Sequence, residues 1–230
     1  MQFINHIKQL LSPYILLEHA VLTDQAAHIQ KLPVALQQAV ITRKDEFLTG
    51  RRLAQQMLHR QDIRDTEQIF HYPLPQWPTG WLGNISHCAT DVIVALTQQA
   101  DYLGIDLEHW VEPEFALQSA DLLLHTHEKQ LYARLASQLS WTEYVTLVFS
   151  IKESLYKAIY PKVQQYIDFL EAYIVDINLA TQTLSLSFTA DMQNKHQLEG
   201  KYYGYWHADQ DFIVTIVSDL IHKMPLQPED

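Results

Sequence analysis

The chain has 230 residues, of which 47% are hydrophobic and 19% are charged, so it can bury one large domain or two smaller ones and is not wholly disordered. Its formal net charge is −11, which argues against nucleic acid and anionic membranes as partners, because phosphate-rich surfaces would be repelled. Any anionic ligand must therefore bind at a local group of basic side chains.

Three features of the sequence bear on the cellular compartment of the protein. The single cysteine, Cys88, cannot form an internal disulfide and is typical of a reducing compartment. The first twenty residues mix polar with apolar residues and contain no cleavage site, so no signal peptide is expected. No apolar run approaches the ~20 residues that a membrane helix needs. We expect a cytoplasmic protein without a membrane span.

Along the chain, helical and strand patterns follow one another without regular alternation. Helical spacing covers 34–60, 127–139 and 141–160, and strand patterns cover 91–97, 102–109, 175–188 and 211–218. Pro161 is expected to stop the last helix. No glycine-rich phosphate loop occurs, which removes the usual signatures of dinucleotide-dependent dehydrogenases and P-loop hydrolases. These patterns favour a mixed α and β fold with a boundary near 99–103.

A basic segment marks the start of the first long helix. Thr42 followed by Asp45 resembles a capping box, which predicts that the helix begins at Thr42. Arg43 and Lys44 then lie in the first turn, where the helix dipole disfavours cations. Arg51 lies two turns later on nearly the same face. Either an anion binds at this helix start or the basic side chains only face the solvent; the segment alone leaves both readings open.

Two carboxylates lie close together on the strand expected over 102–109. Alternation turns Asp106 and Glu108 to one face, with Cβ atoms about 7 Å apart, and turns Ile105 and Leu107 to the other face. The two carboxylates repel each other unless a positive charge lies between them. A hard cation such as Mg²⁺ suits these ligands, and a solvated acidic strand face is the alternative.

A third carboxylate lies on the second long helix. Glu153 and Lys157 are i,i+4 neighbours, and Phe149 lies one turn before Glu153. An ordinary surface ion pair explains Glu153 and Lys157 on their own. If Glu153 packs near Asp106 and Glu108, however, the three acids complete a metal site with basic residues beside it for phosphate.

Two other groups of reactive residues are set aside. Ser86, His87 and Cys88 are consecutive, and adjacent side chains of an extended segment point apart, so neither Ser86 nor Cys88 pairs with His87 as nucleophile and base. His125 and His127 have no cysteine near them, and two histidines make a weak case for zinc. We expect neither a covalent nucleophile nor a zinc site.

Four segments in order resemble the 4′-phosphopantetheinyl transferases of the two-half, surfactin-type class, and most closely its enterobactin-synthase subgroup. They are F-L-T-G-R (47–51), W-P-x-G-x-x-G-N-I-S-H-C (77–88), G-I-D-L-E (104–108) and F-S-I-K-E-S-L-Y-K (149–157). Each motif is weak to moderate alone, but the ordered set is specific, and it covers about residues 42–160. Asn84 departs from the serine that is common in the family, and Phe149 replaces a frequent tryptophan but is familiar in this subgroup.

The resemblance implies an α+β fold of two similar halves related by a pseudo-twofold axis, each with a small sheet packed against a long helix. The coenzyme would lie in the cleft between the halves. We place the halves at 1–101, with the coenzyme A phosphate contacts, and 102–230, with the metal and catalytic residues. We expect a monomer.

The implied activity moves the 4′-phosphopantetheine arm of coenzyme A to a serine of an apo aryl, peptidyl or acyl carrier protein. Adenosine 3′,5′-bisphosphate is released, and the expected role is siderophore-type nonribosomal peptide synthesis. The matched positions are Asp106, Glu108 and Glu153 for Mg²⁺; Glu153 as base and Lys157 as helper of the leaving group for catalysis; and Arg43, Arg51, Ser86, His87, Lys152 and Lys157 for coenzyme A. The alternatives are a non-catalytic carrier-binding protein of the same fold and a metal-dependent phosphate-ester hydrolase.

Overall fold

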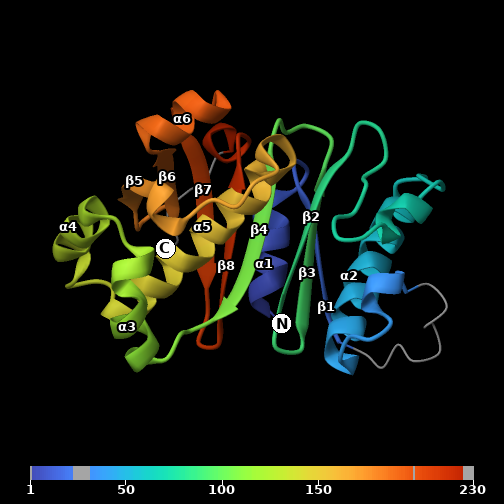
Figure 1. Cartoon of the computed structure of the whole chain (residues 1–230), viewed down its shortest axis with the longest axis horizontal. Helices are drawn as coiled ribbons and strands as arrows, with labels where there is room; N and C mark the ends of the chain where they lie inside the picture. The colour runs from blue at the N-terminus through green and yellow to red at the C-terminus, as the bar shows by residue number, and fades with distance from the viewer. Residues whose placement is uncertain (1, 23–31, 199, 225–230) are drawn as a thin grey trace. The chain divides into compact units, whose positions relative to one another are not determined.

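The computed structural model describes residues 2–22, 32–198 and 200–224 and divides the chain into two compact units, Met1–Gln99 and Ala100–Asp230. Each unit contains its own antiparallel sheet with a long helix packed on it (Figure 1). The expected α+β class is confirmed. The pseudo-twofold relation between the halves stays a prediction.

The first unit is a three-stranded sheet with strand order β1-β3-β2. Its elements are α1 (Gln2–Leu11), β1 (Leu16–Val21), η2 (Val34–Leu36), α2 (Ile41–Arg60), η3 (Glu67–Phe70), β2 (Leu82–Cys88) and β3 (Asp91–Thr97). Helix α2 packs on the sheet through buried Ala54, Met57 and Leu58. Gly50 allows the closest approach, because a Cβ there would lie 2.7 Å from the Ile85 side chain on β2.

The start of α2 differs from the sequence prediction. The helix begins at Ile41, and the residue before it, Val40, caps it without any side-chain hydrogen bond. The backbone N–H of Lys44 donates to the Val40 carbonyl at 3.3 Å, so helical bonding is already under way before Thr42. Thr42 is therefore the second helical residue, and the predicted capping box was wrong. Arg43 and Lys44 still lie at the first turn.

The second unit is a five-stranded sheet with strand order β4-β8-β7-β6-β5. Its elements are β4 (Leu103–His109), α3 (Pro113–Leu123), α4 (Thr126–Leu135), α5 (Trp141–Val163), η4 (Phe169–Glu171), β5 (Ala172–Asn178), β6 (Thr183–Phe188), α6 (Ala190–His196), β7 (Tyr202–Ala208), β8 (Phe212–Ser218) and η5 (Ile221–Lys223). Figure 1 shows α5 lying across β4 and β8, with α3 and α4 on its other side.

Helix α5 carries the core of the second unit. A capping box starts it, in which the Ser140 hydroxyl accepts from the backbone of Glu143 and the Glu143 carboxylate accepts from the backbone of Ser140. The predicted stop at Pro161 was wrong, since the helix runs on to Val163. Val163 is buried, and its packing holds a last turn that proline alone would have weakened.

Most strand predictions agree with the structure. The patterns over 91–97, 102–109 and 211–218 correspond to β3, β4 and β8, and the pattern over 175–188 is a hairpin of β5 and β6. Helix α4 ends earlier than expected. The predictions omitted α1, β1, β2, α3, α6 and β7. Within the described residues, no helix is long and apolar enough to cross a membrane.

Candidate active site

The second unit brings the acid of β4 against α5. Gly104 and Asp106 lie on the strand face that α5 covers, and the Asp106 side chain is only 2% exposed. Its Oδ2 accepts a hydrogen bond of 2.9 Å from the Ser150 hydroxyl. Its Oδ1 accepts one of 2.6 Å from the Lys157 ammonium. A buried carboxylate is thus held from two positions on one helix.

Glu153 lies between these contacts on α5. Burial raises the pKa of its carboxyl group, the positive charge of Lys157 opposes that rise, and the negative charge of Asp106 adds to it. The charges of both Lys157 and Asp106 therefore act on the Glu153 carboxyl group. The structure brings together Asp106, Glu153 and Lys157, three of the residues that the sequence singled out.

Glu108 is half-buried at the end of β4, opposite Ile213 of β8. Among the described residues, no three His, Cys, Asp or Glu side chains are grouped tightly enough to hold a metal ion. Magnesium at phosphate-transfer sites is often bound by only one or two carboxylates, with waters and substrate phosphates completing the shell. Asp106 already has a cation, the Lys157 ammonium, on one oxygen. Carboxylate oxygens suit a hard divalent cation, so Asp106 and Glu153 stay candidate ligands, and a site of three carboxylates stays a prediction.

The first unit groups basic side chains at the start of α2 and on β2. The Nη1 atom of Arg43 lies 3.0 Å from the Glu46 carboxylate and 2.9 Å from His87 Nε2. His87 Nε2 also lies 3.5 Å from that carboxylate. Glu46 therefore offsets part of the positive charge while it fixes both side chains in place.

Arg51 is the most unusual cation of the first unit. It is 7% exposed, and burial, followed by the charge of Arg43, lowers its pKa to about 10. Its Nη2 donates to the Pro73 carbonyl at 3.3 Å, and the guanidinium lies 4.9 Å from the Phe47 ring centre. Its Nε has no hydrogen-bond partner among the described residues. A buried guanidinium with so little compensation is suited to bind an anion.

Ser86 and His87 are separated by strand alternation. His87 contacts Arg43 at the start of α2, and Ile85 two residues earlier meets α2 at Gly50. Ser86 therefore faces the opposite side of β2, where it is buried. The structure does not bring Ser86 to the Arg43–His87 group. Cys88 likewise faces away from His87.

Lys152 lies beside Glu153 in sequence but is not part of the acidic group. Its ammonium is buried and donates to the Leu123 carbonyl at 2.7 Å, to the Glu128 carboxylate at 2.7 Å and to the Phe169 carbonyl at 3.0 Å. Burial lowers its pKa, and Glu128 opposes that effect. All three donors are used inside the second unit, so the structure gives Lys152 no donor for a phosphate.

Sequence reasoning missed the hydroxyl groups that support Asp106. The Ser150 hydroxyl lies 2.9 Å from that of Thr215 on β8, and Ser154 lies 2.7 Å from the same Thr215 oxygen. The available signal was the spacing of Ser150, Ser154 and Lys157, which places polar groups on one face of a largely apolar helix.

Two family models match the chain and together cover most of it. The model of the 4′-phosphopantetheinyl transferase superfamily matches residues 102–217. The model of the 4′-phosphopantetheinyl transferase N-terminal domain matches residues 31–97. The chain belongs to the 4′-phosphopantetheinyl transferase superfamily. The family expected from the motifs and its enzyme class, a phosphopantetheinyl transferase, are thereby confirmed.

Several named proteins are similar to this chain over most of their length. Enterobactin synthase component D of Salmonella typhimurium is 31% identical over 178 residues, which are 76% of this chain and 72% of the relative. The Escherichia coli protein of that name is 32% identical, over 79% of this chain and 80% of the relative. The 4′-phosphopantetheinyl transferase Svp of Streptomyces mobaraensis is 30% identical, over 85% of this chain and 77% of the relative.

Proposed function

We propose that this protein moves the 4′-phosphopantetheine arm of coenzyme A to a serine of an apo carrier protein in a magnesium-dependent reaction. The observation that carries the proposal is the contact of β4 with α5, where buried Asp106 is held by Lys157 and Ser150 with Glu153 beside it. Family membership gives the transferred group, and this acidic group supplies the chemistry that the transfer needs.

The reaction exchanges one phosphate–oxygen bond for another. The carrier serine oxygen attacks the pyrophosphate phosphorus that bears the pantetheine arm, and the bond from that phosphorus to the bridging oxygen breaks. Adenosine 3′,5′-bisphosphate leaves. Glu153 accepts the serine proton, and Lys157 offsets the negative charge that grows on the departing oxygen. Mg²⁺ would neutralise charge on the pyrophosphate oxygens. Asp106 and Glu153 would hold it together with water and substrate phosphate, and Glu108 stays a ligand implied by the family motif.

The basic group of the first unit binds the phosphates of coenzyme A in this proposal. Arg51 offers a buried cation with an unpartnered Nε. Arg43 lies at the start of α2, where backbone N–H groups also favour anions, and His87 of β2 contacts it there. The contact of Ser86 with coenzyme A stays a prediction, since Ser86 is buried on the face of β2 opposite His87. We leave Lys152 out, because its ammonium has three internal acceptors.

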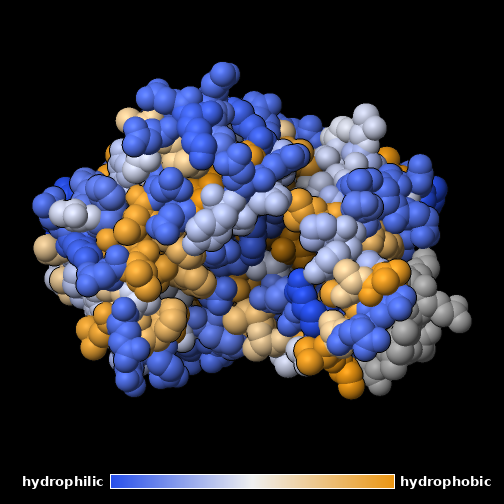
Figure 2. Space-filling view, in the orientation of Figure 1, coloured by the Kyte–Doolittle hydropathy of each residue, from blue (hydrophilic) through white to orange (hydrophobic). Residues whose placement is uncertain are grey.

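The proposed second substrate, an apo carrier protein, would meet apolar surface on the second unit. Phe115 is 47% exposed and Leu122 is 69% exposed; they lie two turns apart and so share one side of α3. Figure 2 shows apolar side chains gathered over this part of the second unit. With a net charge of −11, the enzyme would be poorly steered toward an acidic carrier, so an apolar contact is the better basis for recognition.

The pathway belongs to the proposal as well. Two of the relatives named above carry the name enterobactin synthase component D. We infer that the carrier of this chain belongs to a siderophore-type nonribosomal peptide synthetase.

Intact-protein mass spectrometry of an apo carrier tests the proposal directly. The carrier is incubated with this protein, coenzyme A and Mg²⁺, and a gain of one phosphopantetheine group on its serine is expected. A carrier whose serine is replaced by alanine and a reaction with chelator are the controls, and both should stay unmodified.

The same experiment separates the two alternatives. Release of free phosphopantetheine or phosphate in a reaction without carrier would identify a hydrolase. Binding of the carrier without any change in its mass would identify a non-catalytic carrier-binding protein. Either result contradicts the proposal.

A further inference from the structure

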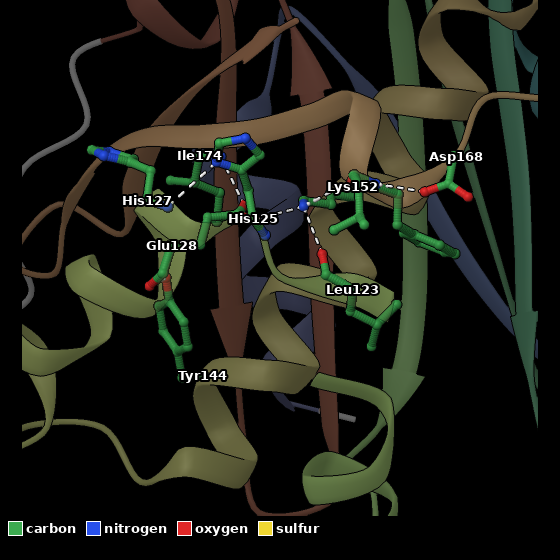
Figure 3. Close-up of polar contacts among 10 residues, drawn as sticks. Leu123, His125, His127, Glu128, Tyr144, Lys152, Asp168 and Ile174 are labelled. Atoms are coloured by element: carbon green, nitrogen blue, oxygen red, sulfur yellow. Dashed lines mark hydrogen bonds and ion pairs between the residues drawn. The ribbon is translucent and has the colours of Figure 1, made fainter. Parts of the chain in front are cut away.

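A buried ion pair lies beside the catalytic segment of α5 and has no place in the chemistry proposed above. The Lys152 ammonium and the Glu128 carboxylate are 2.7 Å apart, and their side chains are 2% and 0% exposed. Figure 3 shows this pair among elements that are distant in sequence. Charged groups are rarely buried this completely without a specific arrangement of partners.

Glu128 uses both carboxylate oxygens to join α4 to β5. Oε2 accepts from the backbone N–H of His125, which closes the capping box of α4, and also from Lys152. Oε1 accepts from the backbone N–H of Ile174 at 2.8 Å. Ile174 lies on β5, the edge strand, next to a bulge where pairing with β6 shifts. The Glu128 carboxylate therefore accepts a backbone N–H of β5 beside the point where the pairing of β5 with β6 is irregular.

Lys152 uses its other two donors to join α3 and η4 to α5. It donates to the carbonyl of Leu123, the last residue of α3, and to the carbonyl of Phe169, the first residue of η4. A carbonyl at a helix C-terminus lacks an intrahelical partner and lies at the negative end of the helix dipole. The ammonium thus satisfies a buried group and binds three elements together.

We propose that the Glu128–Lys152 pair is a positioning device that sets the rotation of α5, so that Glu153 and Lys157 are presented to Asp106. The proposal rests on the catalytic role proposed for Glu153. Neither Glu128 nor Lys152 touches substrate, because both are buried and their polar atoms are fully occupied. They act through Glu153 and Lys157.

The geometry of a helix explains why this pair has such an effect. Consecutive side chains on an α-helix differ by about 100° in direction, so an anchor at Lys152 fixes where Glu153 points. Ser150 and Lys157 are the contacts from α5 to Asp106 on the other side. The helix is therefore held from two directions, by β4 at Asp106 and by α3, α4 and η4 at Lys152. Without the second hold, α5 can turn while it still covers the sheet.

Three variants and one control test the proposal. Glu128→Gln keeps the size of the side chain and an acceptor for Ile174, but it loses the charge that holds Lys152. Lys152→Met keeps much of the apolar stem, and the double variant removes both charges. Lys162→Met is the control, since Lys162 is an exposed lysine on the same helix. For each variant, the turnover number, the calorimetric Kd for coenzyme A and the melting temperature are measured, with assays well below the lowest melting temperature.

The expected result is a loss of turnover without a loss of coenzyme A binding. The turnover number should fall by about ten- to a hundredfold in all three variants, because small displacements of catalytic groups are costly, and the Kd for coenzyme A should not change. Lys152→Met should melt lowest, because it leaves a buried carboxylate unpaired, and the double variant should recover part of that loss. Amide hydrogen exchange in 149–157 should speed up. Lys162→Met should behave as the wild type.

Three outcomes separate the competing explanations. Wild-type turnover in a fully folded Glu128→Gln or double variant would overturn the proposal and leave the pair a purely stabilising role. A weaker affinity of Lys152→Met for coenzyme A would also overturn it and would assign Lys152 to the phosphates. Full activity of Glu153→Gln, measured alongside, would instead refute the proposed role of Glu153.

Discussion

Replacing Arg51 by methionine should have opposite effects on the stability of the ligand-free protein and on its affinity for coenzyme A. Burial, and after it the charge of Arg43, lowers the pKa of Arg51 from its ordinary value to about 10, which corresponds to roughly 3 kcal/mol at 1.36 kcal/mol per pKa unit. Because the pKa is lower in the folded state, this cost is complete at every pH below about 10 and disappears only as the pH rises through the higher pKa of an ordinary arginine.

The contacts that methionine would lose offset part of that gain. The long hydrogen bond to the Pro73 carbonyl contributes about 1 kcal/mol, and the position over the Phe47 ring contributes about 1 kcal/mol. The remainder predicts that Arg51→Met is about 1 kcal/mol more stable than the wild type without ligand. A charge-assisted contact to phosphate contributes about 1.5–3 kcal/mol, so the affinity for coenzyme A should fall roughly ten- to a hundredfold.

Urea unfolding with and without coenzyme A, together with calorimetry, measures both effects. Arg52→Met is the matched control, since Arg52 is the next residue on α2 and is less buried; it should change neither quantity much. Dephospho-coenzyme A identifies the phosphate, because the variant should bind it as well as coenzyme A if Arg51 holds the 3′-phosphate. A variant that is several kcal/mol less stable and binds coenzyme A normally would refute the reasoning, since Arg51 would then be a structural residue.

Three further predictions concern the chemistry and the carrier. Glu153→Gln should lower turnover by roughly a hundredfold or more at every Mg²⁺ concentration, whereas Asp106→Ala should regain activity at high Mg²⁺ or with Mn²⁺. The rate of each variant, measured against metal concentration, distinguishes the two roles. Full recovery of Glu153→Gln at high metal concentration would show that Glu153 is only a ligand. Cys88→Ser should keep most activity, because His87 faces away from it; an enzyme–pantetheine adduct at Cys88 in a mass spectrum would contradict this. Leu122→Glu should raise the KM for the carrier and leave the Kd for coenzyme A unchanged; an unaltered KM would remove α3 from the proposed docking surface.

The sequence predicted elements best where one periodicity dominated. The strands β3, β4 and β8 have apolar patterns bounded by turns, and α5 has a capping box and an apolar stripe, so local signals sufficed. The start of α2 was misplaced because Thr42 and Asp45 have the right residue types, whereas the helix begins earlier without a side-chain cap. Helix α5 runs past Pro161 because Val163 is buried, a tertiary contact that no local rule contains.

The candidate site divides in the same way. Strand alternation placed Asp106 toward a partner element, and helical spacing placed Glu153 beside Lys157, so the acidic group followed from local geometry and family motifs. Lys152 was assigned to phosphate because it belongs to the same motif. Its actual partner, Glu128, lies 24 residues earlier in the chain, and only the fold brings the two together. The direction of a lysine side chain is decided by which acceptors surround it, and that is tertiary information.

The glycine of the G-I-D-L-E segment shows how the distance between elements becomes part of the site. A Cβ at Gly104 would overlap the backbone carbonyl of Ser154 and lie 2.8 Å from the nitrogen of Ala158. Because both obstacles are backbone atoms of α5, no rotation of a side chain relieves the overlap, and any larger residue must push the helix away from β4. That displacement would lengthen the 2.6 Å contact of Lys157 with Asp106, whereas hydrogen bonds of this type normally span about 2.7–3.2 Å. The absent side chain at Gly104 is therefore what lets the acids of the strand and the helix share one site.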